Sequence, residues 1–114
     1  MIQKGSIVTC VVSGDFGKSR PAVVVQSDLF NETHQSITIC PITTHIVDAP
    51  LFRLLLAPDK INGLKMPSQI MVDKVVSIKR DKIRDAIGKL TTDQMVKLDK
   101  AIVVWLDLSK QMSI

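Results

Sequence analysis

The apolar run at residues 22–25, which reads Ala-Val-Val-Val, most constrains how this chain can fold. Consecutive β-branched residues bounded by polar loops indicate a strand that is buried on both faces. Arg20 and Pro21 stand directly before this run, where the flexible polar loop of residues 14–19 meets it. A guanidinium at such a junction has a defined position and an open approach, which suits binding to a phosphate or a carboxylate.

Other short β-rich runs follow one another along the chain with turn residues between them. We expect strands at residues 6–12, 21–26, 36–40, 51–56, 68–73 and 74–78. The run at 36–40 alternates apolar and polar residues, and we expect it to stop at Pro41. Residues 82–90 fit a strand or a helix by pattern, and Gly88 together with the need to close a sheet favours a strand.

The last segment is a predicted amphipathic helix. Thr91 and Gln94 have the spacing of a capping box. Apolar side chains then recur at helical spacing until about Leu108, at Met95, Leu98, Ile102 and Trp105. The sequence therefore predicts a mainly β protein, with six or seven antiparallel strands in a small, strongly bent sheet and one C-terminal helix.

The length of 114 residues predicts one domain over residues 1–114. Lys and Arg outnumber Asp and Glu by 15 to 11, which gives a net charge of +4. This charge modestly favours a nucleic-acid partner. No apolar stretch approaches the length of a membrane span, and Lys4 and Gly5 interrupt any signal-peptide pattern. We therefore expect a cytoplasmic protein without a membrane partner.

Cys10 and Cys40 lie thirty residues apart, without CxxC or paired histidine spacing. That arrangement does not favour a zinc site, and we expect no metal or cofactor. The spacing leaves a disulfide open, because it says nothing about the distance between the two Cα atoms. The favoured interpretation is two small, buried hydrophobic residues.

Arg20 has two interpretations from the sequence. It could pair with a nearby carboxylate such as Asp15 or Asp73, or it could bind a phosphate and stabilise charge during phosphoryl transfer. Thr43 and Thr44 come shortly after Pro41, where we expect the sheet to give way to a loop. Threonines at such a place are usually turn or capping residues, but a hydroxyl there can also donate to a phosphate beside a guanidinium.

Further candidates lie on loops and on the expected strand at 68–73. His45 could be a general base, or simply an exposed histidine. Gln69 and Asp73 share a face of that strand, where Asp73 could pair with a lysine, orient Arg20 or contact a base edge. Phe16, in the polar loop, could stack on an unpaired base. Trp105 is expected in the core or in a dimer interface.

In this order, several motifs resemble the MazF/PemK (Kid) family of toxin endoribonucleases from bacterial toxin–antitoxin pairs. They are Lys4-Gly5-Ser6-Ile7-Val8, Gly17-Lys18-Ser19-Arg20-Pro21-Ala22-Val23-Val24-Val25, Pro41-Ile42-Thr43-Thr44, Ser68-Gln69-Ile70-Met71-Val72-Asp73-Lys74 and Ile87-Gly88-Lys89-Leu90, followed by the helix with Met95, Leu98 and Leu106. The resemblance covers nearly the whole chain. It implies an SH3-like barrel that forms a homodimer and cleaves single-stranded RNA, such as mRNA, at specific sequences without a metal.

The resemblance also implies a mechanism and a set of residues. The RNA 2′-hydroxyl would attack the adjacent phosphate, leaving a 2′,3′-cyclic phosphate and a 5′-hydroxyl end. Arg20 would stabilise the phosphorane and Thr43 would hydrogen-bond the phosphate, with Thr44 as an alternative. Asp73 matches a position linked to RNA binding or catalysis. We expect the RNA-binding surface to include Phe16, Lys18, Ser19, Gln69 and Lys74.

Two positions depart from the family pattern. Many members carry Glu or His in the first loop, where this chain has Asp15, so Asp15 and His45 are the local candidates for a general base. Met71 stands where some members have a basic residue, which bears on substrate preference.

Other functions remain open from the sequence. CcdB-like toxins share the fold but bind gyrase and cleave nothing, and they would use the dimer and the terminal helix. An RNA-binding module without catalysis is a third interpretation. For a nuclease toxin we expect an antitoxin with an acidic, partly disordered segment that competes for the basic groove.

Overall fold

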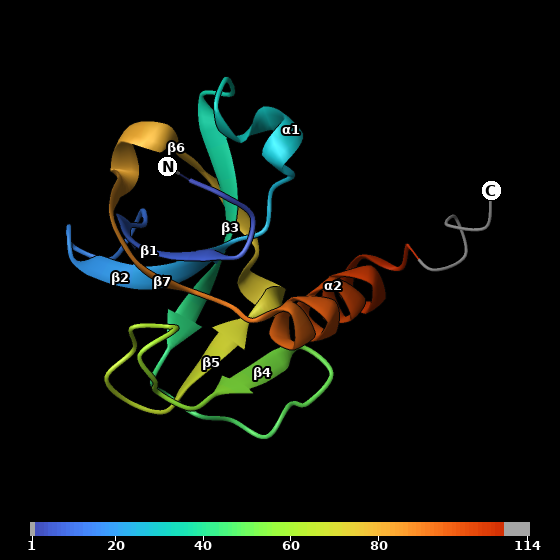
Figure 1. Ribbon diagram of the computed structural model, residues 1–114. Coiled ribbons are helices and arrows are strands. Elements are labelled where there is room, and N and C mark those ends of the chain that lie inside the picture. The colour runs from blue at the N-terminus through green and yellow to red at the C-terminus, as the bar shows by residue number, and fades with distance from the viewer. Residues whose placement is uncertain (1, 109–114) are drawn as a thin grey trace.

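The computed structural model of the protein describes residues 2–108. These residues form seven strands, two α-helices and two short 3-10 turns (Figure 1). In chain order they are β1 (Ser6–Val11), β2 (Ser19–Val24), α1 (Asp28–Asn31), β3 (Ser36–Thr43), β4 (Arg53–Leu56), β5 (Ser68–Met71), η1 (Val72–Lys74), β6 (Val76–Lys79), η2 (Arg80–Lys82), β7 (Ile83–Lys89) and α2 (Thr92–Leu106).

The strands pair antiparallel in the order β4-β5-β3-β2-β1-β7, and β6 pairs with β3 outside this path. β3 is the pivot of the sheet because it changes partners along one edge. Its residues 36–39 pair with β6, and Ile42 and Thr43 pair with β5. The β4–β5 hairpin therefore turns away from the rest of the sheet, below it in Figure 1. The predicted fold, mainly β with a bent antiparallel sheet and a C-terminal helix, is confirmed.

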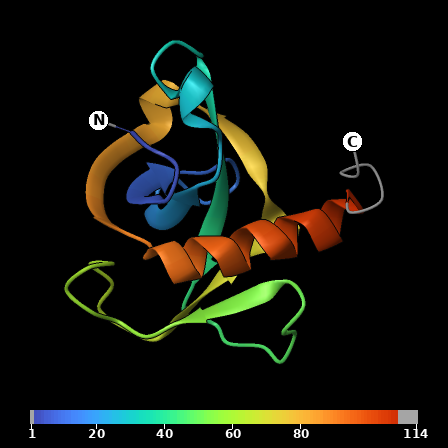
Figure 2. The same cartoon turned by 45° about the vertical axis from the view of Figure 1, so that its right-hand side comes forward.

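The prediction of a strand buried on both faces is confirmed for residues 22–24, whereas Val25 follows the end of β2 and is partly buried. Val23 packs in one apolar cluster with Ile7 and Cys40, and Ala22 and Val24 pack in a second cluster on the other face. Helix α2 covers the first cluster through Leu98 and Ala101 and runs across that side of the sheet (Figure 2). β2 is thus held rigidly between two cores.

Cys10 and Cys40 are free and buried, one in each cluster. The question of a disulfide, left open by the spacing, is settled by this separation. Burial, followed by the charge of Asp73, raises the pKa of Cys40 to about 12, and burial also raises the pKa of Cys10. Both side chains therefore act as small apolar residues, as expected.

The expected strand end at Pro41 is wrong, since β3 continues to Thr43. Pro41 pairs with Ala22 of β2 and falls between the β6 and β5 pairings on the other edge. The amide hydrogen that proline lacks is therefore not needed for a ladder bond at that edge. As a result, Thr43 belongs to the sheet and does not begin a loop.

Four other expected strands have different limits. β5 stops at Met71, and residues 72–74 form η1, so Asp73 lies in a turn and Lys74 does not begin a strand. β4 begins at Arg53, because the Phe52 and Arg53 amides both donate to Ala49 in a preceding turn. β2 begins earlier than expected, at Ser19, so the sheet includes Arg20.

Helix α2 confirms the predicted capping box. The Thr91 hydroxyl accepts from the Gln94 amide, and the Gln94 side chain accepts from the Thr91 amide. Trp105 is 45% exposed and packs against Phe52, with ring centroids 5.4 Å apart, so it lies at the rim of the core. Within residues 2–108, no helix is long and apolar enough to cross a membrane.

Leu98→Ala is expected to lower the free energy of unfolding by about 2–5 kcal/mol, because Leu98 is fully buried between α2 and the sheet. Urea denaturation followed by circular dichroism measures this change. Val104→Ala on the exposed side of the same helix is the control, with an expected change within about 0.5 kcal/mol. Equal effects of the two variants would contradict the assigned core face.

Candidate active site

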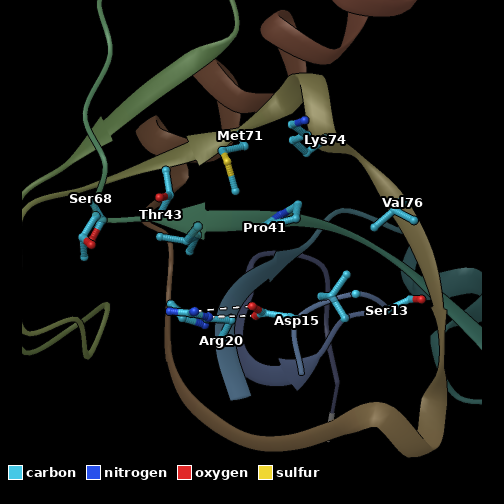
Figure 3. Close-up of a pocket in the computed structure, with 14 residues that line it drawn as sticks. Ser13, Asp15, Arg20, Pro41, Thr43, Ser68, Met71, Lys74 and Val76 are labelled. Carbon is cyan, nitrogen blue, oxygen red and sulfur yellow. Dashed lines mark hydrogen bonds and ion pairs between the residues drawn. The ribbon is translucent and has the colours of Figure 1, made fainter. Parts of the chain in front are cut away.

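An open pocket of about 600 Å³ lies where the β1–β2 loop, the first residues of β2, the end of β3 and the β5–η1 segment meet (Figure 3). Its lining residues are Val12, Ser13, Gly14, Asp15, Arg20, Pro21, Pro41, Ile42, Thr43, Thr44, Ser68, Met71, Lys74 and Val76. Three sequence-predicted catalytic candidates, Asp15, Arg20 and Thr43, are therefore brought together here, with Thr44 and Lys74 beside them.

Arg20 faces the pocket because side chains alternate between the two faces of β2. Arg20, Ala22 and Val24 point to the same face of the strand, since every second side chain does so. Ala22 and Val24 are buried in the second apolar cluster, whereas Arg20 is exposed at the end of the row. The same face of β2 therefore forms part of the core at Ala22 and Val24 and borders the pocket at Arg20.

Thr43 lines the same pocket as Arg20 and lies on the neighbouring strand. β2 and β3 pair from Val24 against Ile39 to Ala22 against Pro41, and Arg20 and Thr43 each lie two residues beyond that last pair. By strand alternation, Thr43 shares the sheet face of Pro41 and Arg20 shares that of Ala22. The Thr43 hydroxyl oxygen accepts a hydrogen bond from the His45 amide at 3.1 Å, so its own proton remains free to be donated.

Asp15 forms an ion pair with Arg20 inside the pocket. Nε of Arg20 donates to one carboxylate oxygen at 2.8 Å and Nη2 to the other at 3.4 Å (Figure 3). The hydrogen bond from Arg20 lowers the pKa of Asp15, with smaller contributions from the charges of Arg20 and Lys18. Arg20 has five N–H donors, so it keeps donors for a second anion.

The loop that carries Asp15 turns tightly and presents Phe16 to solvent. Gly14 and Gly17 have φ values of +85° and +75°, which glycine adopts without strain, and Phe16 has a φ of +54°. Phe16 is 97% exposed. The loop therefore places an aromatic ring at its tip, outside the lining of the pocket.

Two predicted site residues are occupied elsewhere. Gln69 is 3% exposed, and its amide both accepts from the Val47 amide and donates to the Val47 carbonyl, so it holds the loop after β3. Asp73 pairs with Arg53 of β4, at 2.7 and 3.1 Å, instead of a lysine or Arg20. Neither side chain lines the pocket, and the two do not share a strand face, because η1 intervenes.

The remaining predicted residues do not line the pocket. His45 is exposed on the loop after β3, and it meets Thr43 through its backbone. Lys18 and Ser19 are exposed where the first loop enters β2. Within residues 2–108 there is no group of three His, Cys, Asp or Glu side chains that could hold a metal ion.

Sequence reasoning missed Arg53. It lies twenty residues from Asp73, and no local spacing connects the two. It also gave Ser68 no role, although Ser68 lines the pocket and its hydroxyl donates to the Met66 carbonyl. Such contacts depend on how β4, β5 and η1 meet in space.

Comparison with known proteins identifies the family of the chain. The family described as "PemK-like, MazF-like toxin of type II toxin-antitoxin system" matches residues 3–106. The chain belongs to this family. The resemblance inferred from the motifs is thus confirmed, and the match favours a MazF-like toxin over the gyrase-binding alternative.

Individual MazF relatives extend the match along most of the chain. A probable endoribonuclease MazF of Mycolicibacterium smegmatis is 36% identical over 109 residues, which are 95% of this chain and 99% of the relative. Endoribonuclease MazF9 of Mycobacterium tuberculosis is 31% identical over 78% of this chain and 79% of its own.

Solved structures share the fold. The Mycobacterium tuberculosis toxin MazF-mt6 superposes with a TM-score of 0.78 at 24% identity, covering 90% of this chain and 96% of the toxin. A mycobacterial endoribonuclease in complex with its cognate antitoxin gives a TM-score of 0.79 at 18% identity, covering 95% and 97%. The MazF-type architecture predicted from the sequence is therefore confirmed.

Arg20→Gln is expected to raise the pKa of Asp15 toward its ordinary value, because the Arg20 hydrogen bond is the main cause of the lowering. In the wild type, the stabilisation from this pair is present above the ordinary carboxyl pKa and is lost as pH falls through the lowered value. An NMR titration of the Asp15 carboxyl carbon measures the shift. An unchanged Asp15 titration in the variant would show that the ion pair does not form in solution.

Proposed function

We propose that this MazF-like toxin is an endoribonuclease that cleaves single-stranded RNA in the pocket around Arg20, without a metal ion. The observation that carries the proposal is that Arg20 of β2, Thr43 of β3 and Asp15 of the first loop line one open pocket. The names of the relatives, which include endoribonucleases of two mycobacteria, support the same activity. Cleavage of cellular RNA would inhibit translation and growth.

In the proposed reaction, the nucleophile belongs to the RNA. The 2′-oxygen forms a bond to the adjacent phosphorus, the bond from phosphorus to the 5′-oxygen breaks, and the products carry a 2′,3′-cyclic phosphate and a 5′-hydroxyl. Attack within one molecule needs positioning, charge stabilisation and proton transfer, and it needs no protein nucleophile. The pocket contains groups suited to each of these tasks.

Arg20 is the proposed stabiliser of the phosphorane. Its position at the rigid end of β2 presents a planar set of donors that matches phosphate oxygens. Thr43 would donate its free hydroxyl proton to a second oxygen of the same phosphate. Thr44 lines the same pocket and is the alternative donor.

Asp15 is the proposed acceptor of the 2′-hydroxyl proton, because it lines the pocket and His45 does not. Its lowered pKa makes it a weak base while Arg20 is bound to it alone. A phosphate that takes up donors of Arg20 weakens this hydrogen bond, and the proton affinity of Asp15 then rises. The leaving 5′-oxygen takes a proton from water, and the hydroxide so formed takes the proton held by Asp15, which regenerates the carboxylate.

The flanking nucleotides are proposed to follow the exposed residues around the pocket. Phe16 offers a ring for base stacking, while Lys18, Ser19 and Lys74 offer contacts to phosphates. Gln69 would act indirectly, by holding the loop that follows Thr44. Single-stranded RNA suits this surface because its bases can splay outward.

The proposed partner is an antitoxin with an acidic, partly disordered segment, since such a segment could compete with RNA for Arg20 and Lys74. A homologous fold has been solved as an endoribonuclease with its cognate antitoxin. We further propose that the toxin is a homodimer and acts in the cytoplasm, where translated RNA is found.

Arg20→Ala is expected to reduce RNA cleavage by at least about a hundredfold, the usual loss when a charge-stabilising group is removed. Purified protein incubated with RNA in EDTA, followed by mapping of the ends, measures the rate and the cyclic phosphate. Arg84→Ala is the matched control, because Arg84 is exposed on β7 and lies outside this pocket. Full activity of the Arg20 variant, or intact RNA with stalled gyrase in the wild type, would overturn the proposal.

Thr43→Val is expected to lower kcat about tenfold or more, because it removes a phosphate donor and preserves the shape of the side chain. Thr44→Val provides the comparison, since both hydroxyls lie at the pocket. Single-turnover cleavage rates measure the two effects. A larger loss in the Thr44 variant would reassign the donor to Thr44.

A further inference from the structure

The wall of the pocket opposite Arg20 depends on η1. Met71 ends β5 and Lys74 ends η1, and both line the pocket. In a continuing strand, residues three apart would point to opposite faces, whereas in a 3-10 turn they lie on the same side. The turn therefore brings Lys74 to the pocket beside Met71.

Asp73 lies inside this turn and has a single strong partner. Arg53 of β4 donates hydrogen bonds to both oxygens of its carboxylate, from Nε at 2.7 Å and from Nη2 at 3.1 Å. The side chains of Arg53 and Asp73 are only 12% and 15% exposed, so water screens the pair weakly. Arg53 pairs with Met71 in the β4–β5 register, which sets it beside the turn.

Lys74 follows Asp73 directly in η1, so a second cation is the chain neighbour of this carboxylate. The Arg53 hydrogen bond is the main cause of the lowered pKa of Asp73, and the charge of Lys74 lowers it further. Asp73 is thus an anion next to a pocket that, under the proposed function, must bind phosphates. Without Arg53, this carboxylate would repel RNA and draw the Lys74 ammonium to itself.

We infer that Arg53 is a positioning residue for RNA binding: by holding the Asp73 carboxylate, it keeps Lys74 free to contact an RNA phosphate. Arg53 itself does not line the pocket, so its inferred role is indirect. Asp73 then has an indirect role in RNA binding and makes no contact to a base. This inference rests on the proposed function for the identity of the ligand.

The test compares the affinity of Arg53→Gln, Asp73→Asn and the double variant for a short, mixed-sequence, 2′-O-methylated single-stranded RNA. Fluorescence anisotropy measures binding, and the methyl groups prevent cleavage. We expect R53Q to weaken binding about fivefold, the effect of losing one surface charge contact. The slope of log affinity against log salt should fall in magnitude by about 0.7, the value for one phosphate contact on a single strand.

The two Asp73 variants separate the inferred role from the alternatives. D73N should bind RNA at least as well as the wild type, because it removes the anion and leaves Lys74 free. The double variant should recover the affinity and salt slope lost in R53Q. Arg84→Gln, which removes an exposed cation outside this pocket, should leave the salt slope unchanged.

Several outcomes overturn the inference. A double variant that stays as weak as R53Q would show that Arg53 acts only by supporting the fold. Weak binding by D73N would show that Asp73 contacts RNA directly. Wild-type cleavage of RNA with unchanged affinity in R53Q would reject the inference and leave the proposed function standing, whereas a wild type that neither binds nor cleaves RNA would reject both.

Discussion

The burial of β2 on both faces is the constraint on which the rest of the molecule depends. Val23 packs toward α2, and Ala22 and Val24 pack toward the second cluster, so the strand cannot shift its register without moving apolar groups into water. Arg20 continues the row of Ala22 and Val24 just beyond the core. A rigid strand thereby fixes the main cation of the pocket, while a glycine-containing loop supplies its partner Asp15.

The pocket forms next to β2 because β3 changes its pairing partner along one edge. It pairs with β6 up to Ile39 and with β5 from Ile42, and the hairpin that includes β5 turns away from the sheet. The pocket lies at this bend, with Arg20 and Asp15 on one side and Thr43, Met71 and Lys74 on the other (Figure 3). Pro41 sits between the two pairings, where a missing amide hydrogen costs the least.

Most of the fold and half of the site could be predicted from local pattern. Residues 22–24 and the Thr91–Gln94 capping box were assigned correctly, because burial and capping act over a few neighbouring residues. The end of β3 and the turn at η1 were not, since both depend on which strand lies alongside. Arg20, Thr43 and Asp15 line one pocket, whereas Gln69 and Asp73 are engaged by Val47 and Arg53, which lie about twenty residues away.

The sequence by itself determined the mainly β fold, the terminal helix, the family and the cation at the start of β2, because alternation, capping and ordered motifs are local properties of the chain. Only the tertiary structure decided that Arg20 is paired with Asp15, that Cys10 and Cys40 lie in separate cores, and that Arg53 neutralises Asp73. The physical reason is the same in each case. The neighbours of each side chain are decided by distance in space, and that distance follows from how the loops and strands pack together.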